Sequence, residues 1–164
     1  VITKPDHRLS RFDIKMTSLL GNVMANDYAI KQGVHEALLV RDGNITEASH
    51  SNVFFVKDEV VYTHPANEYI LNGITRQITI KLCHDLGIKI KEEEVPATEV
   101  TSMDEVFLTG TTTRIASVKY IDQQEFYPGQ KIGSITRRLQ QGFRDLREQH
   151  RQKSTIPVAN SSVV

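Results

Sequence analysis

Apolar side chains recur at helical spacing in three segments of the chain. The pattern predicts one helix over residues 16–33, a second over 75–86, and a third that begins at Ser134. Gly33 and Gly87 follow the first two segments and are typical stop signals. The hydroxyl of Ser134 is expected to cap the third helix.

Short runs of apolar and β-branched residues between these helices predict strands. The Asp42-Gly43 pair is a hairpin signal between two of these runs. The predicted strands lie within residues 35–40, 52–57, 60–63, 88–95, 105–108 and 114–121. Because strands and helices alternate irregularly, we expect an α+β fold with a mixed or antiparallel, barrel-like sheet and flanking helices.

The 164-residue length indicates one domain with a sizeable core. Basic and acidic residues number 20 each, so net charge gives no support for a nucleic-acid partner. No stretch has the length and apolarity of a membrane span, and no membrane association is expected. The single cysteine, Cys83, has no disulfide partner, and the histidines lack metal-ligand spacing, so no metal is expected. These features favour a reducing, cytoplasmic setting.

Two residues stand out as candidates for chemistry. Lys15 lies at the predicted start of the first helix, and a water-excluding site there would hold it as the neutral amine that forms imines. A lysine in that position is also commonly an exposed surface residue. Glu47 directly precedes an apolar run, so its carboxylate needs a positive partner. That partner is either one of the arginines, in a structural pair, or a protonated ring nitrogen.

Two further segments have the composition of anion-binding turns. Residues 72–75 (Asn-Gly-Ile-Thr) lead into a predicted helix, whose first N–H groups have no helical partner. Residues 110–113 (Gly-Thr-Thr-Thr) follow a predicted strand and offer N–H groups and hydroxyls. An ordinary helix cap and an ordinary strand edge are the alternatives. A lysine, a carboxylate and two anion-binding turns, in this order along the chain, are the groups that a pyridoxal-phosphate site requires.

The sequence resembles the second half of the class IV (fold-type IV) pyridoxal-phosphate-dependent aminotransferases, and within them it is most similar to D-amino-acid aminotransferases. The resemblance extends over about residues 8 to 147. It is carried by Asp13-Ile14-Lys15 with Leu19-Leu20, Ile45 to Ser49, Ser51 to Phe54, Tyr62 to Asn67, Ile70 to Arg76 and Asp104 to Thr112.

The resemblance implies a role for each matching residue. Lys15 would form the Schiff base and move the substrate proton, and Glu47 would bind the pyridine nitrogen. The further cofactor contacts would be Leu71 on the ring and Gly73, Ile74, Thr75, Gly110 and Thr111 at the phosphate, with Arg8, His50 and Ser51 near the site. We therefore expect Lys15, Glu47, Thr75 and Thr111 to converge on one cleft.

The reaction implied is transfer of an amino group from an amino acid, such as D-alanine, to a 2-oxo acid. Aminodeoxychorismate lyase and branched-chain aminotransferase activity are alternatives within the family, and a non-catalytic isolated domain is another. His50 stands where relatives usually carry a small residue, and Ser117 replaces a common proline.

Members of the family are homodimers of about twice this length. The resemblance therefore implies that residues 1–14 enter from a missing N-terminal domain needed for the full site. It implies a cofactor-binding domain over residues 15–150 and a flexible tail over 151–164.

Overall fold

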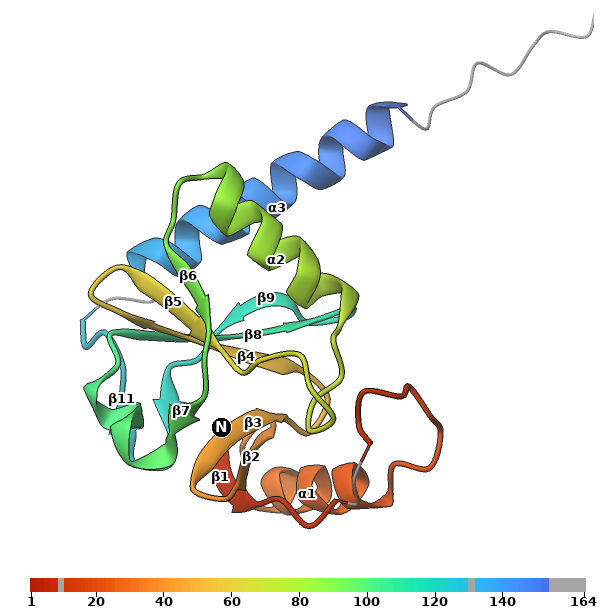
Figure 1. The fold of residues 1–164 in the computed structure, drawn as a ribbon. Coiled ribbons are helices and arrows are strands. Elements are labelled where there is room, and N and C mark those ends of the chain that lie inside the picture. Colours follow the sequence, from red (N-terminus) through yellow and green to blue (C-terminus); the bar gives the residue numbers. More distant parts are fainter. Residues whose placement is uncertain (9–10, 130–131, 154–164) are drawn as a thin grey trace, which may run out of the picture.

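The computed structural model describes residues 1–8, 11–129 and 132–153, and these form two large sheets and one two-stranded sheet, with helices on the outer sides of the large sheets (Figure 1). The four-stranded sheet has the order β1 (Ile2–Pro5), β2 (Ala37–Arg41), β3 (Asn44–Ala48) and β7 (Val95–Pro96). The five-stranded sheet has the order β6 (Ile90–Glu92), β5 (Val60–Thr63), β4 (Asn52–Lys57), β8 (Glu105–Gly110) and β9 (Arg114–Ser117). The other elements are α1 (Leu20–Lys31), α2 (Ile74–Asp85), the 3-10 helix η1 (Ala97–Ser102), the hairpin β10 (Tyr120–Ile121) and β11 (Gln124–Glu125), and α3 (Ser134–Lys153).

The α+β prediction with mixed sheets is confirmed, with one correction to its shape. Most neighbouring strands are antiparallel, but β1 pairs with β2 in parallel and β5 pairs with β6 in parallel. Among the described residues, the strands form separate sheets rather than one closed barrel, so the barrel-like expectation was too specific. A closed barrel needs continuous pairing around its circumference, and here β1, β6, β7 and β9 remain as sheet edges.

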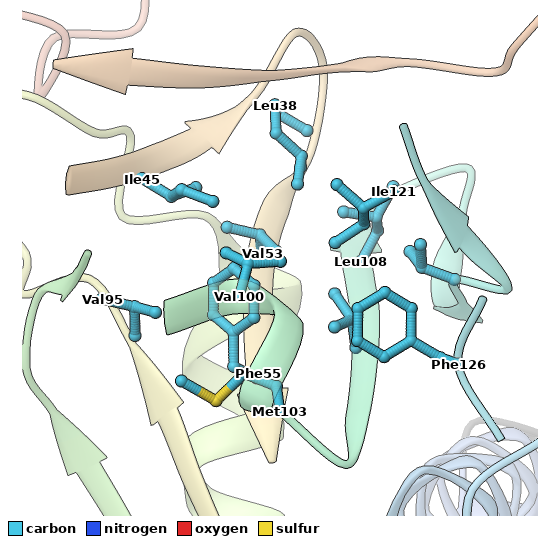
Figure 2. Packing of buried hydrophobic residues seen from close by; sticks show 13 residues of the cluster. Leu38, Ile45, Val53, Phe55, Val95, Val100, Met103, Leu108, Ile121 and Phe126 are labelled. Atoms are coloured by element: carbon cyan, nitrogen blue, oxygen red, sulfur yellow. The ribbon is translucent and has the colours of Figure 1, made fainter. Parts of the chain in front are cut away.

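The first hydrophobic core lies between the two sheets. Figure 2 shows Leu38 and Ile45 of the four-stranded sheet facing Val53, Phe55 and Leu108 of the five-stranded sheet. The 3-10 helix and the segment after β9 close the sides of this core with Val100, Met103, Ile121 and Phe126.

The second core lies on the opposite face of the five-stranded sheet, under α2 and α3 (Figure 1). Phe54 of β4 and Phe107 of β8 stack there with ring centroids 5.0 Å apart. Leu82 and Cys83 of α2 pack in the same cluster, and burial raises the pKa of the Cys83 thiol to about 12. Because β4 is covered on both faces, its apolar run is continuous instead of alternating.

Helix α1 differs from its prediction in both its start and its orientation. The helix begins at Leu20 rather than at residue 16, and it buries Asn22 and Ala29 against the rest of the chain. Leu20 is 71% exposed and Met24 is 63% exposed, so the predicted apolar stripe faces outward. Apolar residues surround α1 on several sides, so the sequence pattern alone does not select the inner face.

The start of α3 is capped by a distant strand and not by Ser134. The carboxylate of Glu105, at the start of β8, accepts hydrogen bonds from the Ile135 and Thr136 N–H groups at 2.9 and 2.8 Å. It also accepts from the Thr136 hydroxyl at 2.7 Å and the Ser134 hydroxyl at 3.3 Å. A side chain at Gly133 would overlap this carboxylate, since a Cβ there would lie 2.0 Å from the Glu105 Cδ.

Helix α3 extends to Lys153, past the predicted domain boundary at residue 150. The rest of the predicted tail, residues 154–164, lies outside the described residues. In the described part of the chain, no helix has the length and apolarity to cross a membrane.

We predict that Glu105→Ala lowers the free energy of unfolding by about 2–3 kcal/mol, because buried donors at the start of α3 lose their charged acceptor. Urea unfolding followed by circular dichroism measures the change. Glu99→Ala, at an exposed carboxylate of η1, is the control and should change stability by less than about 0.5 kcal/mol. Equal stabilities of the two variants would contradict the assigned cap.

Candidate functional site

Glu47 of β3 is a buried carboxylate held by three donors from separate segments. The residue is 6% exposed, and the Arg8 guanidinium donates to Oε1. Oε2 accepts from the Asn52 amide and from the Leu71 backbone N–H, each at 3.2 Å. Of the two alternatives raised by the sequence, the arginine partner is therefore present, and the network brings β3, the start of β4 and the segment before α2 together.

Arg8 lies between two carboxylates. Its Nε and Nη2 donate to Oδ1 and Oδ2 of Asp6 at 2.8 and 2.9 Å, and Nη2 also donates to the Tyr69 carbonyl at 3.0 Å. The Phe12 ring stacks on the guanidinium with its centroid 4.1 Å from Cζ. Contacts on several sides thus fix Arg8, and only one of its nitrogens, Nη1, donates a hydrogen bond to Glu47.

The two carboxylates respond differently to this shared arginine. Burial raises the pKa of Glu47 to about 7, although the charge and hydrogen bond of Arg8 act in the opposite direction. Burial alone would also raise the pKa of Asp6, but its hydrogen bonds and charge contact with Arg8 hold that pKa below its usual range. Glu47 is therefore the carboxylate of this pair that exchanges a proton near neutral pH.

Asn52, at the start of β4, joins this network to the start of α2. Besides Glu47, its amide donates to the Leu71 carbonyl at 2.7 Å. A Cβ at Gly73 would lie 2.6 Å from the Asn52 Oδ1, so only glycine fits this close approach. Asn52 also pairs across the sheet with Thr109, the residue before Gly110. The start of β4 therefore lies beside both predicted anion-binding turns.

The first of the two predicted turns is an uncapped helix start. Gly73 precedes α2 in extended conformation, and no side chain caps the helix there. Ile74 is exposed and Thr75 is buried in the first turn. N–H groups in the first turn of a helix have no helical acceptor, so those of Ile74 and Thr75 remain available to an anion.

The second turn begins where β8 ends. Gly110 lies against Ser51, whose Oγ would be 3.2 Å from a Cβ at that position. Thr111 follows in an exposed turn. Ser51 is itself held by Glu36, which accepts its hydroxyl at 2.8 Å and the His50 backbone N–H at 3.0 Å. The exposed His50 ring lies next to this carboxylate, with Nδ1 4.0 Å from Oε2 of Glu36.

Lys15 is placed differently from its prediction. It lies in the exposed segment before α1, and not at the start of the helix. Within the same segment, Arg11 has a positive φ of 79° and pairs with Asp13 at 2.9 Å. An ammonium group stays in water unless a partner compensates for its burial. The structure thus joins Arg8, Glu47, Leu71 and Gly73 directly, while Lys15 faces solvent.

Asn52 and Glu36 are the site residues that the sequence reasoning missed. Asn52 is the polar first residue of a strand whose next four residues are apolar, and Glu36 is a charged residue directly before the buried start of β2. A buried polar position beside an apolar run is a signal that could have identified both residues. The pattern cannot name their partners, because these lie on other elements.

The chain is similar to D-alanine aminotransferases over most of its length. It is 43% identical to the D-alanine aminotransferases of Staphylococcus epidermidis and Staphylococcus aureus over 149 residues, which are 91% of this chain and 52% of each relative. It is 44% identical to that of Listeria monocytogenes over 143 residues, which are 87% of this chain and 49% of the relative. The chain therefore spans about half the length of the curated relatives it matches.

Solved structures of aminotransferases share the fold. The branched-chain amino acid aminotransferase of Escherichia coli matches with a TM-score of 0.81 at 30% identity, over 88% of this chain and 49% of that one. The PLP form of the enzyme from Thermobaculum terrenum gives 0.82 at 30% identity, over the same shares of the two chains. An aminotransferase from Brucella abortus bound to PLP gives 0.77 at 27% identity, over 88% and 53%.

The raised pKa of Glu47 predicts a specific pH dependence of stability. In the unfolded chain Glu47 loses its proton near pH 4.5, while in the folded chain it keeps the proton to about pH 7. Glu47 therefore makes its full contribution to the free energy of unfolding below pH 4.5. As the pH rises to 7, this contribution is lost, and the free energy of unfolding falls by about 3 kcal/mol. Glu47→Gln should remove this decline, as measured by urea unfolding at several pH values.

The surface variant Glu99→Gln is the control and should keep the decline. The lowered pKa of Asp6 affects stability only below its usual value of 3.8, outside this pH range. Parallel profiles for the unaltered chain and Glu47→Gln between pH 4.5 and 7 would contradict the assignment.

The family model that matches this sequence describes amino-transferase class IV, and it extends over residues 2–121. These residues include β1 to β9 and helices α1 and α2, and with them the Glu47 network and both turns. The family model, the D-alanine aminotransferase relatives and the fold agree, and the chain belongs to the class IV amino-transferase family.

Proposed function

We propose that this chain is the cofactor-binding part of a pyridoxal-phosphate-dependent aminotransferase that moves the amino group of a D-amino acid, such as D-alanine, to a 2-oxo acid. The observation that carries the proposal is the meeting of three features at the start of β4. These are the buried Glu47 carboxylate, the uncapped start of α2 at Gly73, and the Gly110 turn, each in contact with Ser51 or Asn52.

The residues present fit the cofactor. A carboxylate accepts about four hydrogen bonds, and Glu47 uses three, which leaves room for a protonated ring nitrogen. The free N–H groups of Ile74 and Thr75 suit a phosphate. Gly110 and Thr111 offer a second group of donors beside Ser51.

Pyridoxal phosphate, when bound, supplies an aldehyde that joins amines and a ring that accepts the electron pair of the substrate α-carbon. In our proposal Glu47 keeps the proton on the ring nitrogen, and Arg8 and Asn52 hold Glu47 in position. Leu71 contributes an aliphatic surface to the ring. The Lys15 amine would hold the aldehyde until the substrate amine takes its place, and the freed amine would then move the proton at the substrate α-carbon.

The exposed position of Lys15 indicates what the rest of the enzyme must provide. We propose an N-terminal domain that precedes residues 1–14, covers the domain over 15–150 and excludes water from the lysine. We further propose a homodimer, and a cytoplasmic location in keeping with the single reduced Cys83. The exposed apolar residues of α1, among them Leu20 and Met24, support a covering partner of this kind.

D-Amino acids are favoured over branched-chain substrates because the D-alanine aminotransferases are 43–44% identical to this chain, against 30% for the branched-chain enzyme of known structure. Assays with D-alanine, L-leucine and aminodeoxychorismate on the complete enzyme would separate transaminase from lyase activity. Activity with only one of the last two would contradict the D-amino-acid proposal.

We predict that Glu47→Gln in the complete enzyme leaves the cofactor bound and lowers kcat by about 100-fold. The neutral amide cannot keep the ring nitrogen protonated, so removal of the α-proton becomes slower. Single-turnover absorbance measurements with D-alanine follow this step directly. An unchanged rate with Glu47→Gln would show that Glu47 is only a structural partner of Arg8.

We predict that the 164-residue chain alone associates into dimers or larger species and has little or no transaminase activity. Its apolar α1 surface drives association, and its lysine is not shielded from water. Activity should return when the N-terminal domain of a relative is supplied, in the same chain or separately. A monodisperse monomer with robust transfer from D-alanine to 2-oxoglutarate would refute this expectation.

A further inference from the structure

Arg76 is a buried arginine in the first turn of α2 that the proposed mechanism does not use. It is 1% exposed, and its guanidinium contacts three separate segments. Nη1 donates to the Asn72 side-chain oxygen at 2.9 Å, and Nη2 donates to the His64 carbonyl at 2.8 Å. Nη2 also donates to the Glu92 carboxylate of β6 at 2.6 Å.

These contacts fix both ends of the segment between β5 and α2, which is yellow-green in Figure 1. His64 directly follows β5, and Asn72 directly precedes Gly73, the last residue before the helix. Between them lies Leu71, whose N–H donates to Glu47. Arg76 therefore determines where the start of α2 lies relative to the Glu47 carboxylate.

The positive charge of Arg76 is only partly compensated. Among the described residues its one charged partner is Glu92, whose side chain is 45% exposed, so solvent weakens the attraction between the two charges. The Arg76 Nε is buried and has no hydrogen-bond partner in the part of the chain that the structure describes. Burial of a guanidinium lowers the free energy of unfolding, and an uncharged residue could bridge the same segments with a smaller loss of stability. The charge is held close to the start of α2, because Nη1 donates to Asn72, which directly precedes Gly73.

We propose that Arg76 is a positioning residue for the phosphate end of the cofactor. It fixes Asn72 and Gly73 so that the first N–H groups of α2 point to one place, and its buried charge adds to their attraction for an anion. It acts through the helix start and does not reach the reacting atoms. This inference rests on the function proposed above, because it assumes that a phosphate binds at this helix start.

The test compares two probes that differ only in the phosphate. Equilibrium dialysis of the 164-residue chain measures the Kd of pyridoxal phosphate and of pyridoxal by their own absorbance. Arg76→Gln should weaken binding of pyridoxal phosphate about tenfold or more, the effect of one lost charge-assisted contact. Binding of pyridoxal should change by less than about twofold, since a general loosening of the fold would affect both probes.

Two more variants keep the test informative if Arg76→Gln does not fold. Asn72→Ala removes the acceptor of Nη1 at an exposed position, and it should show a smaller loss with the same preference for the phosphate probe. Arg76→Lys keeps the charge and should recover part of the affinity for pyridoxal phosphate.

Arg138→Gln is the matched control. Its guanidinium donates to the Leu86 carbonyl at the other end of α2, at 3.1 Å, so it should leave both Kd values unchanged. The inference would be overturned if Arg76→Gln and Asn72→Ala lost equal affinity for both probes, or if neither variant lost affinity. Either result would leave the proposed function standing. If the unaltered chain binds pyridoxal no more weakly than pyridoxal phosphate, or binds neither, the proposed phosphate site fails and the inference fails with it.

Discussion

The burial of the Glu47 carboxylate is the constraint on which the geometry of the site depends. A carboxylate removed from water without partners costs on the order of several kcal/mol, so the fold must bring donors to it. Arg8, Asn52 and Leu71 supply them from three segments. Because further contacts fix each donor, the hydrogen bonds to this one carboxylate also hold together the segment after β1, the start of β4 and the segment before α2.

The two cores give this network its rigid support. The five-stranded sheet is covered by the other sheet on one face and by α2 and α3 on the second, so its central strand β4 has little freedom to move. The same packing sets the position of α2, and with it the free N–H groups at its start. Asn52 then links that helix start to the carboxylate, because it donates to Glu47 and lies against Gly73, while Arg76 holds Asn72 directly before Gly73.

The proposed function divides the site between this chain and a covering domain. This chain would contribute the groups for a ring nitrogen and for a phosphate, and contacts within the chain hold these groups in place. The Lys15 amine, in contrast, lies in water. A neutral amine needs a dry environment, and the outward-facing Leu20 and Met24 of α1 are the surface on which a covering domain would find apolar contact.

The sequence by itself determined the local elements and the family. The hairpin at Asp42-Gly43, the apolar β4 strand and the amphipathic α2 all follow from neighbouring residues, because spacing along a few turns or strand positions controls them. The sequence also indicated that Glu47 needs a positive partner, with an arginine as one of two possibilities, and Arg8 is in contact with it. Contacts between distant positions were decided only in the tertiary structure. The inner face of α1, the cap on α3 from Glu105, and the joining of Asn52 to Glu47 depend on which elements meet, and no local pattern encodes that.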